Sequence, residues 1–77
     1  MIKNEEVAAS VSLVLQDAFN RLGESMLQVN QTCSEAEATV YRQKIGDIFY
    51  ILVFGLLEPL YQEHPQLKPS DWDDRKA

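Results

Sequence analysis

The segment that decides the fold runs from Ile45 to Leu57 and reads IGDIFYILVFGLL. Ten of these thirteen residues are large and apolar, and a helix of about 3.6 residues per turn distributes them around its whole circumference. A helix that is apolar on all sides must be buried on more than one side. A single antiparallel partner helix covers less than half of that surface. The sequence therefore predicts that this segment packs against more than one other helix.

Residues 5–30 supply the first partner helix. They contain no proline, and their apolar residues recur at intervals of three and four, which is the spacing of one helix face. Asn4 is positioned to cap the start of this helix, and Glu5 and Glu6 lie where the helix dipole favours negative charge. The predicted apolar face consists of Ala8, Val11, Leu15, Ala18, Leu22, Met26 and Val29.

A tight turn is predicted at residues 31–34, where polar residues interrupt the apolar repeat. Two overlapping capping boxes mark the start of the next helix there, Thr32 with Glu35 and Ser34 with Glu37. Because the turn is short, the two helices must run antiparallel to each other.

The second helix is predicted to span about residues 35–58. Pro59 ends or bends it, because proline lacks an amide hydrogen and disfavours the α conformation at the preceding residue. Residues 59–77 then form an extended, proline-containing tail. Trp72 is the residue expected to dock this tail onto the helices.

These elements predict one all-α domain of residues 1–77, a two-helix antiparallel hairpin. Leaving four large side chains of the second helix in water would forfeit roughly 6–12 kcal/mol. That loss is comparable to the total stability of about 5–15 kcal/mol of an ordinary domain. A homodimer that forms a four-helix bundle is the simplest closed solution. The residues predicted to form the self-association surface are Ile45, Ile48, Phe49, Ile51, Leu52, Phe54 and Leu56.

Two glycines in the second helix are predicted to allow close helix packing. The predicted turn places Phe19 opposite Gly46, and Val11 opposite Phe54 or Gly55. A large side chain facing a glycine lets two helices approach closely. We therefore expect Gly46 and Gly55 to act as packing notches. The number of chains and the docking orientation of two hairpins stay open at this point.

Charge and composition limit the partners. The chain has 7 Lys and Arg against 12 Asp and Glu, a formal net charge of -5, which disfavours nucleic acid and anionic lipid. The uncharged, proline-free run at residues 48–57 is shorter than the ~18–20 residues of a membrane span. The first six residues turn acidic where an export signal would be apolar, and one unpaired cysteine fits a reducing compartment. We expect a cytoplasmic protein without nucleic-acid or membrane partners.

Catalytic chemistry has few candidates. Cys33 is the one cysteine and His64 the one histidine, so no intrachain disulfide or Cys/His metal site is available. Nearby glutamates disfavour a thiolate at Cys33, and no recognisable nucleophile motif accompanies His64. No catalytic, cofactor-binding or metal-binding residue is predicted. Whether Cys33 or His64 has any role stays open.

No specific function can be read from this pattern. It favours a non-enzymatic module for protein–protein interaction or structure that acts as a homo-oligomeric helical bundle, with another protein as a further partner. One alternative is a bundle that binds a small ligand or lipid in an apolar cavity between the second helices. A third hypothesis is an enzyme whose site forms across a dimer interface from His64 or Asp47 of each chain.

Overall fold

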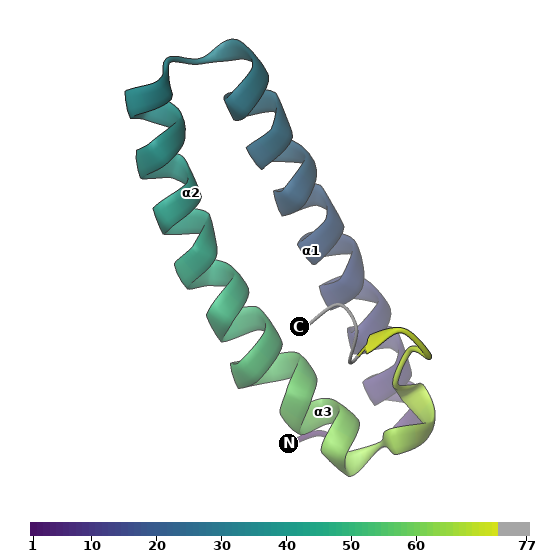
Figure 1. The fold of residues 1–77 in the computed structure, drawn as a ribbon. Coiled ribbons are helices and arrows are strands. Elements are labelled where there is room, and N and C mark those ends of the chain that lie inside the picture. The colour runs from purple at the N-terminus through teal and green to yellow at the C-terminus, as the bar shows by residue number, and fades with distance from the viewer. Residues whose placement is uncertain (73–77) are drawn as a thin grey trace.

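The computed structural model describes residues 1–72 as a hairpin of two long helices (Figure 1). The first helix, α1, spans Glu5–Thr32. The second continues through three segments, α2 at Glu35–Tyr50, the π-helix η1 at Ile51–Leu57 and α3 at Glu58–Glu63. The molecule measures 44 × 21 × 20 Å. The predicted all-α hairpin is therefore confirmed for the described residues.

Both long helices begin at side-chain caps that the sequence predicts. The Asn4 side chain accepts a hydrogen bond from the Val7 amide at 3.1 Å and starts α1. The Ser34 hydroxyl accepts from the Glu37 amide, and the Glu37 carboxylate accepts from the Ser34 amide, each at 3.2 Å. Because the capping box forms at Ser34, Thr32 remains helical, and α1 ends two residues later than predicted.

Of the two outcomes predicted at Pro59, an end of the second helix is wrong, because the helix continues to Glu63. The segment before the proline is a π-helix, in which the Glu58 amide bonds to the Val53 carbonyl five residues back. In a regular α-helix the ring of Pro59 would clash with the carbonyl of Gly55. The wider π turn accommodates the ring, and Pro59 then lies in the first turn of α3, where a missing amide hydrogen is tolerated.

The π-helix also changes which side chains are buried in the hairpin. Ile45 and Leu52, seven residues apart, are 3% and 7% exposed. Regular α-helical spacing from Leu52 would bury Leu56 and Pro59 next. The residues buried instead are Leu57, Leu60 and Tyr61. The wide turn therefore sets the orientation of α3 and of the chain that follows it.

Aromatic packing, rather than glycine notches, joins the long helices at mid-length. The ring centroids of Phe19 and Phe49 lie 4.7 Å apart. A Cβ atom added at Gly46 would meet nothing within 4 Å, and one at Gly55 would meet Ile51 of its own helix. The predicted notches are therefore wrong within one chain, because Phe49 occupies the place facing Phe19. A packing role for the two glycines against a second chain stays a prediction.

The C-terminal segment folds back onto the hairpin. After α3 a 3-10 turn, η2, spans Pro65–Leu67, so the predicted extended conformation is wrong there. Proline is well suited to the first position of such a turn, which explains the difference. The last part of the predicted tail, residues 73–77, lies outside the described residues.

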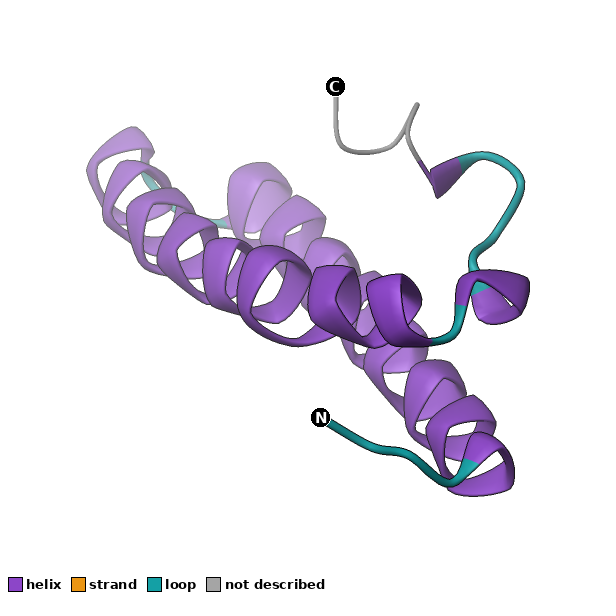
Figure 2. Ribbon diagram, turned by 90° about the horizontal axis from the view of Figure 1, so that it is seen from below, coloured by secondary structure: helices purple, strands orange, loops and turns teal. Residues whose placement is uncertain are grey.

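Trp72 docks this segment, as predicted. It is 4% exposed and belongs to one core cluster with Leu52, Leu57 and Tyr61. Figure 2 shows the C-terminal segment on one side of the hairpin and the N-terminal residues on the other. The two sides of the hairpin therefore carry different terminal segments.

Deletion of Gly55 tests whether the extra residue of the π turn sets which side of α3 is buried. Removing one residue places Leu57, Leu60 and Tyr61 four, seven and eight residues after Leu52, the spacing of one side of a regular α-helix, so these side chains should stay buried. We expect the near-ultraviolet circular dichroism of Tyr61 and Trp72 to be retained and the melting temperature to fall, because the ring of Pro59 then meets the carbonyl of Phe54 four residues before it.

The matched control is deletion of Gly46, which lies before Leu52 in the regular helix α2. This deletion turns Leu52 and every later residue by about 100° relative to Ile45, so the near-ultraviolet spectrum should be lost. Loss of that spectrum in the Gly55 deletion variant as well would contradict the role given to the extra residue of the π turn.

Candidate functional site

A buried polar cluster lies at the open end of the hairpin, where α3 meets α1. Ser12 and Tyr61 are each 3% exposed, and their hydroxyl oxygens lie 2.9 Å apart. The Gln16 side-chain amide donates to both oxygens, also at 2.9 Å. Each of these buried polar groups therefore has a partner, as burial away from water requires. The cluster holds α3 against α1 in one register.

Trp72 covers this cluster from the C-terminal side. Its ring meets Tyr61 edge-on, with centroids 5.0 Å apart and an interplanar angle of 79°. Its indole N–H donates to the Glu58 carboxylate at 3.0 Å. Because Glu58 begins α3, this bond ties the C-terminal segment to the helix that the π turn orients.

His64, which the interface-enzyme hypothesis named, is buried at the end of α3 with 6% exposure. Its Nε2 donates to the backbone carbonyl of Ile2 and lies 3.6 Å from the Glu63 carboxylate. The same carboxylate accepts a hydrogen bond from the ammonium group of Met1 at 3.0 Å, which lowers the pKa of Glu63. His64 thus joins the first residues of the chain to α3.

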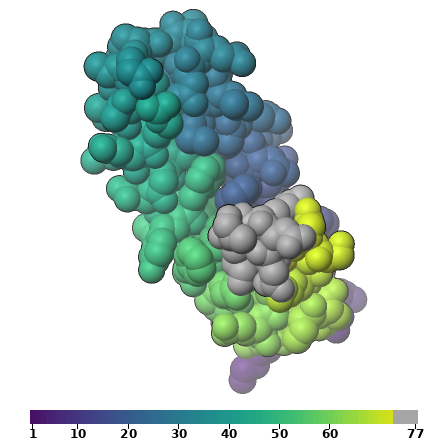
Figure 3. Space-filling view, viewed as in Figure 1, coloured from purple at the N-terminus to yellow at the C-terminus, as the bar shows by residue number. Residues whose placement is uncertain are grey.

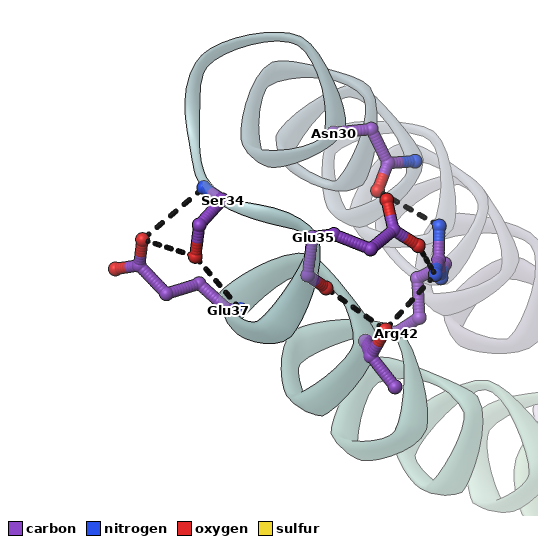
Figure 4. A network of polar contacts seen from close by, with 6 residues as sticks. Asn30, Ser34, Glu35, Glu37 and Arg42 are labelled. Carbon is purple, nitrogen blue, oxygen red and sulfur yellow. Dashed lines mark hydrogen bonds and ion pairs between the residues drawn. The ribbon is translucent and has the colours of Figure 1, made fainter.

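The tip of the hairpin carries a second polar network (Figure 4). Arg42 of α2 donates to the Asn30 side chain of α1 at 3.4 Å. It also donates to Glu35 and to Thr39, each at 3.3 Å. These side chains are exposed, so each contact contributes little stability, but together they hold the two helix ends near each other.

The capping box at the tip lowers the pKa of one carboxyl group, that of Glu37. The hydroxyl of Ser34 donates to the Glu37 carboxylate at 2.9 Å, and the Ser34 amide donates to it as well. These two bonds hold the pKa of Glu37 below its ordinary value. Cys33, which directly precedes Ser34, is exposed.

Four of the predicted self-association residues pack wholly or partly within the single chain. Ile45 and Leu52 are buried in the hairpin, because they lie on the seam that faces α1. Phe49 and Leu56 are half-buried. The chain itself therefore covers most of these four side chains.

The other three remain exposed. Ile48, Ile51 and Phe54 are 45%, 64% and 50% exposed, respectively. Ile48 and Ile51 are three residues apart and share one side of the helix. Phe54 is also three residues from Ile51, but it follows within the π-helix, whose wider turn rotates it to the side of Tyr50, where the two ring centroids lie 5.1 Å apart. The second helix thus presents apolar surface in two directions outside the hairpin.

A shallow apolar groove of about 510 Å³ lies on α2 near the tip, and it is open to solvent. Its lining residues are Ala36, Glu37, Val40, Tyr41 and Lys44. Within residues 1–72, no group of three His, Cys, Asp or Glu side chains is arranged to hold a metal ion.

The continuous helix Glu35–Glu63 is 29 residues long, and its most apolar window has a mean hydropathy of 1.3. By length and composition alone it is sufficient to cross a membrane. Core helices of soluble proteins meet the same criterion, and 28% of that window is buried inside the hairpin.

No protein-family model, curated protein or solved structure matches this chain. Its function has to be inferred from the contacts and surfaces of the chain itself.

The sequence did not reveal the cluster of Ser12, Gln16 and Tyr61. One signal was present, because Ser12 lies four residues from Ala8 on the apolar face of α1, where a hydroxyl needs a buried partner. That partner, Tyr61, is 49 residues away and follows the π-helix. Spacing along the chain therefore could not identify it.

Tyr61→Phe removes the hydroxyl that joins α3 to α1. Because Ser12 stays buried with one partner fewer, we expect the free energy of unfolding to fall by about 1–3 kcal/mol. Urea denaturation followed by circular dichroism measures this loss.

Tyr41→Phe is the matched control, since its hydroxyl lies 2.7 Å from that of Ser25 in a half-buried position. Its loss should be about 1 kcal/mol or less. Equal losses in the two variants would contradict a special role for the buried cluster.

Ser34→Ala removes the capping box and should lower the free energy of unfolding by about 1 kcal/mol near neutral pH. The hydrogen bonds from Ser34 hold the pKa of Glu37 in the folded chain below its ordinary value, so its stabilising effect is fully present above that ordinary value. The effect is lost as the pH falls through the folded pKa. The difference between wild type and variant should therefore shrink on acidification, measured by urea denaturation at neutral and acidic pH.

Thr32→Ala is the control, because Thr32 belongs to the predicted capping box that does not form. This variant should change stability little at either pH. A difference between wild type and Ser34→Ala that is independent of pH would contradict the role of Glu37.

Proposed function

We propose that this chain is a non-enzymatic interaction module that pairs with a second copy of itself into a four-helix bundle and presents the outside of that bundle to another protein. The observation that carries the proposal is the set of large apolar side chains left exposed on both long helices. These residues are Val7, Leu13, Val14, Leu27, Val40, Ile48, Tyr50, Ile51 and Phe54.

The energy of covering such side chains is comparable to the cost of bringing two chains together. Full burial of a large apolar side chain contributes about 1.5–3 kcal/mol, so completing the burial of a half-exposed one contributes roughly 1 kcal/mol. Five such side chains on each of two chains therefore contribute roughly 10 kcal/mol. This gain is similar to the cost of about 4–15 kcal/mol for immobilising two chains.

The groups capable of proton transfer support a structural role. The hydroxyl of Tyr61 lies within hydrogen-bond distance of Ser12 and Gln16, and His64 bonds to the carbonyl of Ile2. These contacts hold α3 and the N-terminal residues in place. Side chains engaged in this way serve the fold, which favours an interaction module over an enzyme.

Binding of a small apolar ligand or lipid is a second candidate, favoured by the groove at Val40 and Tyr41. Ligand sites usually bury most of the ligand surface. This groove is open, so it would contact a ligand on one side, and we rank this function below self-association. A ligand that copurifies with the chain, detected by mass spectrometry, would reverse that order.

Light scattering over a dilution series, with a reductant to protect Cys33, tests the leading proposal. We expect the wild-type chain to have twice the mass of one chain. Ile51→Arg should be monomeric with unchanged helical content, because Ile51 is 64% exposed and its replacement does not disturb the hairpin.

Asn20→Arg is the control for an added charge at an exposed polar position of α1. It should remain dimeric. A wild-type chain that is monomeric at every concentration would contradict the proposal.

A further inference from the structure

The C-terminal segment, residues 65–72, lies on one side of the hairpin. Tyr50, Phe54 and Glu58 follow one another at intervals of four, and Glu58 accepts the hydrogen bond of Trp72. Figure 2 shows that residues 65–72 stand off this side at the open end of the hairpin, and Figure 3 views the same side. A second straight hairpin therefore could not lie flat along the side that carries Phe54.

The second helix exposes a different apolar stripe away from that segment. Val40, Ile48 and Ile51 fall within about 80° of one another around the helix. They are 56%, 45% and 64% exposed, respectively. Lys44, midway between Val40 and Ile48, lies within the angular range of this stripe and is itself exposed.

The first helix extends the stripe. Val14 is two residues from both Ser12 and Gln16, so it lies about 160° around α1 from the cluster that Trp72 covers. Val7 lies two turns before Val14 on the same side. They are 49% (Val7) and 64% (Val14) exposed. We call this surface the uncovered face, and its exposed apolar residues are Val7, Val14, Val40, Ile48 and Ile51.

The uncovered face approaches the size of a dimer interface. The hairpin measures 44 by 21 Å, which corresponds to a projected area on the order of 900 Å², against the ~800 Å² per partner of a standard interface. This area includes the end of the hairpin at the level of Glu63 and His64, where the N-terminal residues reach the same side. These residues therefore belong to the surface that a second chain would contact.

Charge is distributed unevenly along the hairpin. In the open-end half, at residues 1–18 and 50–72, six carboxylates stand against Lys3, Lys68 and the N-terminal ammonium group. In the tip half, at residues 19–49, four carboxylates stand against Arg21, Arg42 and Lys44. Docking with both tips at the same end would place the two acidic ends together, whereas docking with the tips apart sets each acidic end beside a nearly neutral tip.

The position of the apolar residues fits docking with the tips apart. Ile48 and Ile51 lie at the middle of the continuous helix Glu35–Glu63. A two-fold axis that crosses the helix at this point brings Ile48 and Ile51 of one chain onto the same pair of the second.

We propose that the uncovered face binds a second copy of this chain, with the two hairpins docked tips apart around a two-fold axis at Ile48 and Ile51. This inference rests on the proposed self-association and adds its surface and orientation. The side that carries Tyr50 and Phe54 stays outside the interface. It is left for the C-terminal segment and for other partners of the bundle.

Spin labels on native Cys33 measure the orientation directly, because this residue is exposed at the tip. Cys33 lies about 16 residues before the midpoint of the second helix, or about 25 Å. Pulsed electron paramagnetic resonance on the full chain should therefore give a distance of about 50 Å. A distance of about 10–20 Å would mean that the tips lie together and would overturn the orientation.

Two matched variants test the face. Ile51→Arg should be monomeric by light scattering, whereas Phe54→Arg, at a similarly exposed position of the same helix, should remain dimeric. The opposite result would overturn the assignment of the face and leave self-association standing. A monomeric wild-type chain would instead overturn the proposed function itself, so the two failures are distinguishable.

Discussion

The apolar circumference of residues 45–57 is the constraint on which the rest of the structure depends. The helix α1 covers one side of it, where Ile45 and Leu52 are buried. The C-terminal segment covers part of a second side through Trp72. Within residues 1–72 these two elements leave Ile48, Ile51 and Phe54 exposed. The hairpin, the folded-back end and the exposed apolar surface are three results of the same requirement for burial.

The sequence predicts the helices well because their signals are local. Asn4 and Ser34 cap their helices through side chains within three residues, and such bonds depend little on the rest of the chain. Pro59 could not be interpreted in the same way. Its effect on the backbone competes with the burial of Leu60 and Tyr61, and the π-helix is the backbone conformation that accommodates both. A rule about proline alone predicts a helix end at this point.

The contacts between helices were harder to predict, because an error of one residue turns a side chain by about 100°. The glycine notches failed within the chain because the pairing of the two helices is shifted by nearly one turn, so that Phe49, three residues after Gly46, faces Phe19. The partner of Ser12 depends on the register that the π-helix imposes on Tyr61. Trp72 could be assigned from sequence, because a single tryptophan in a polar segment has few other places to be buried.

The hydrogen bond between Trp72 and Glu58 has a consequence for how far an assembly of such chains could grow. A helix pair with flat apolar faces on both sides would add copies on either side and build open-ended stacks. With the C-terminal segment held across one side, copies could add on one side alone, and growth would end at a closed pair. The indole ring of Trp72 would in this way limit the assembly to a dimer and prevent a fibre.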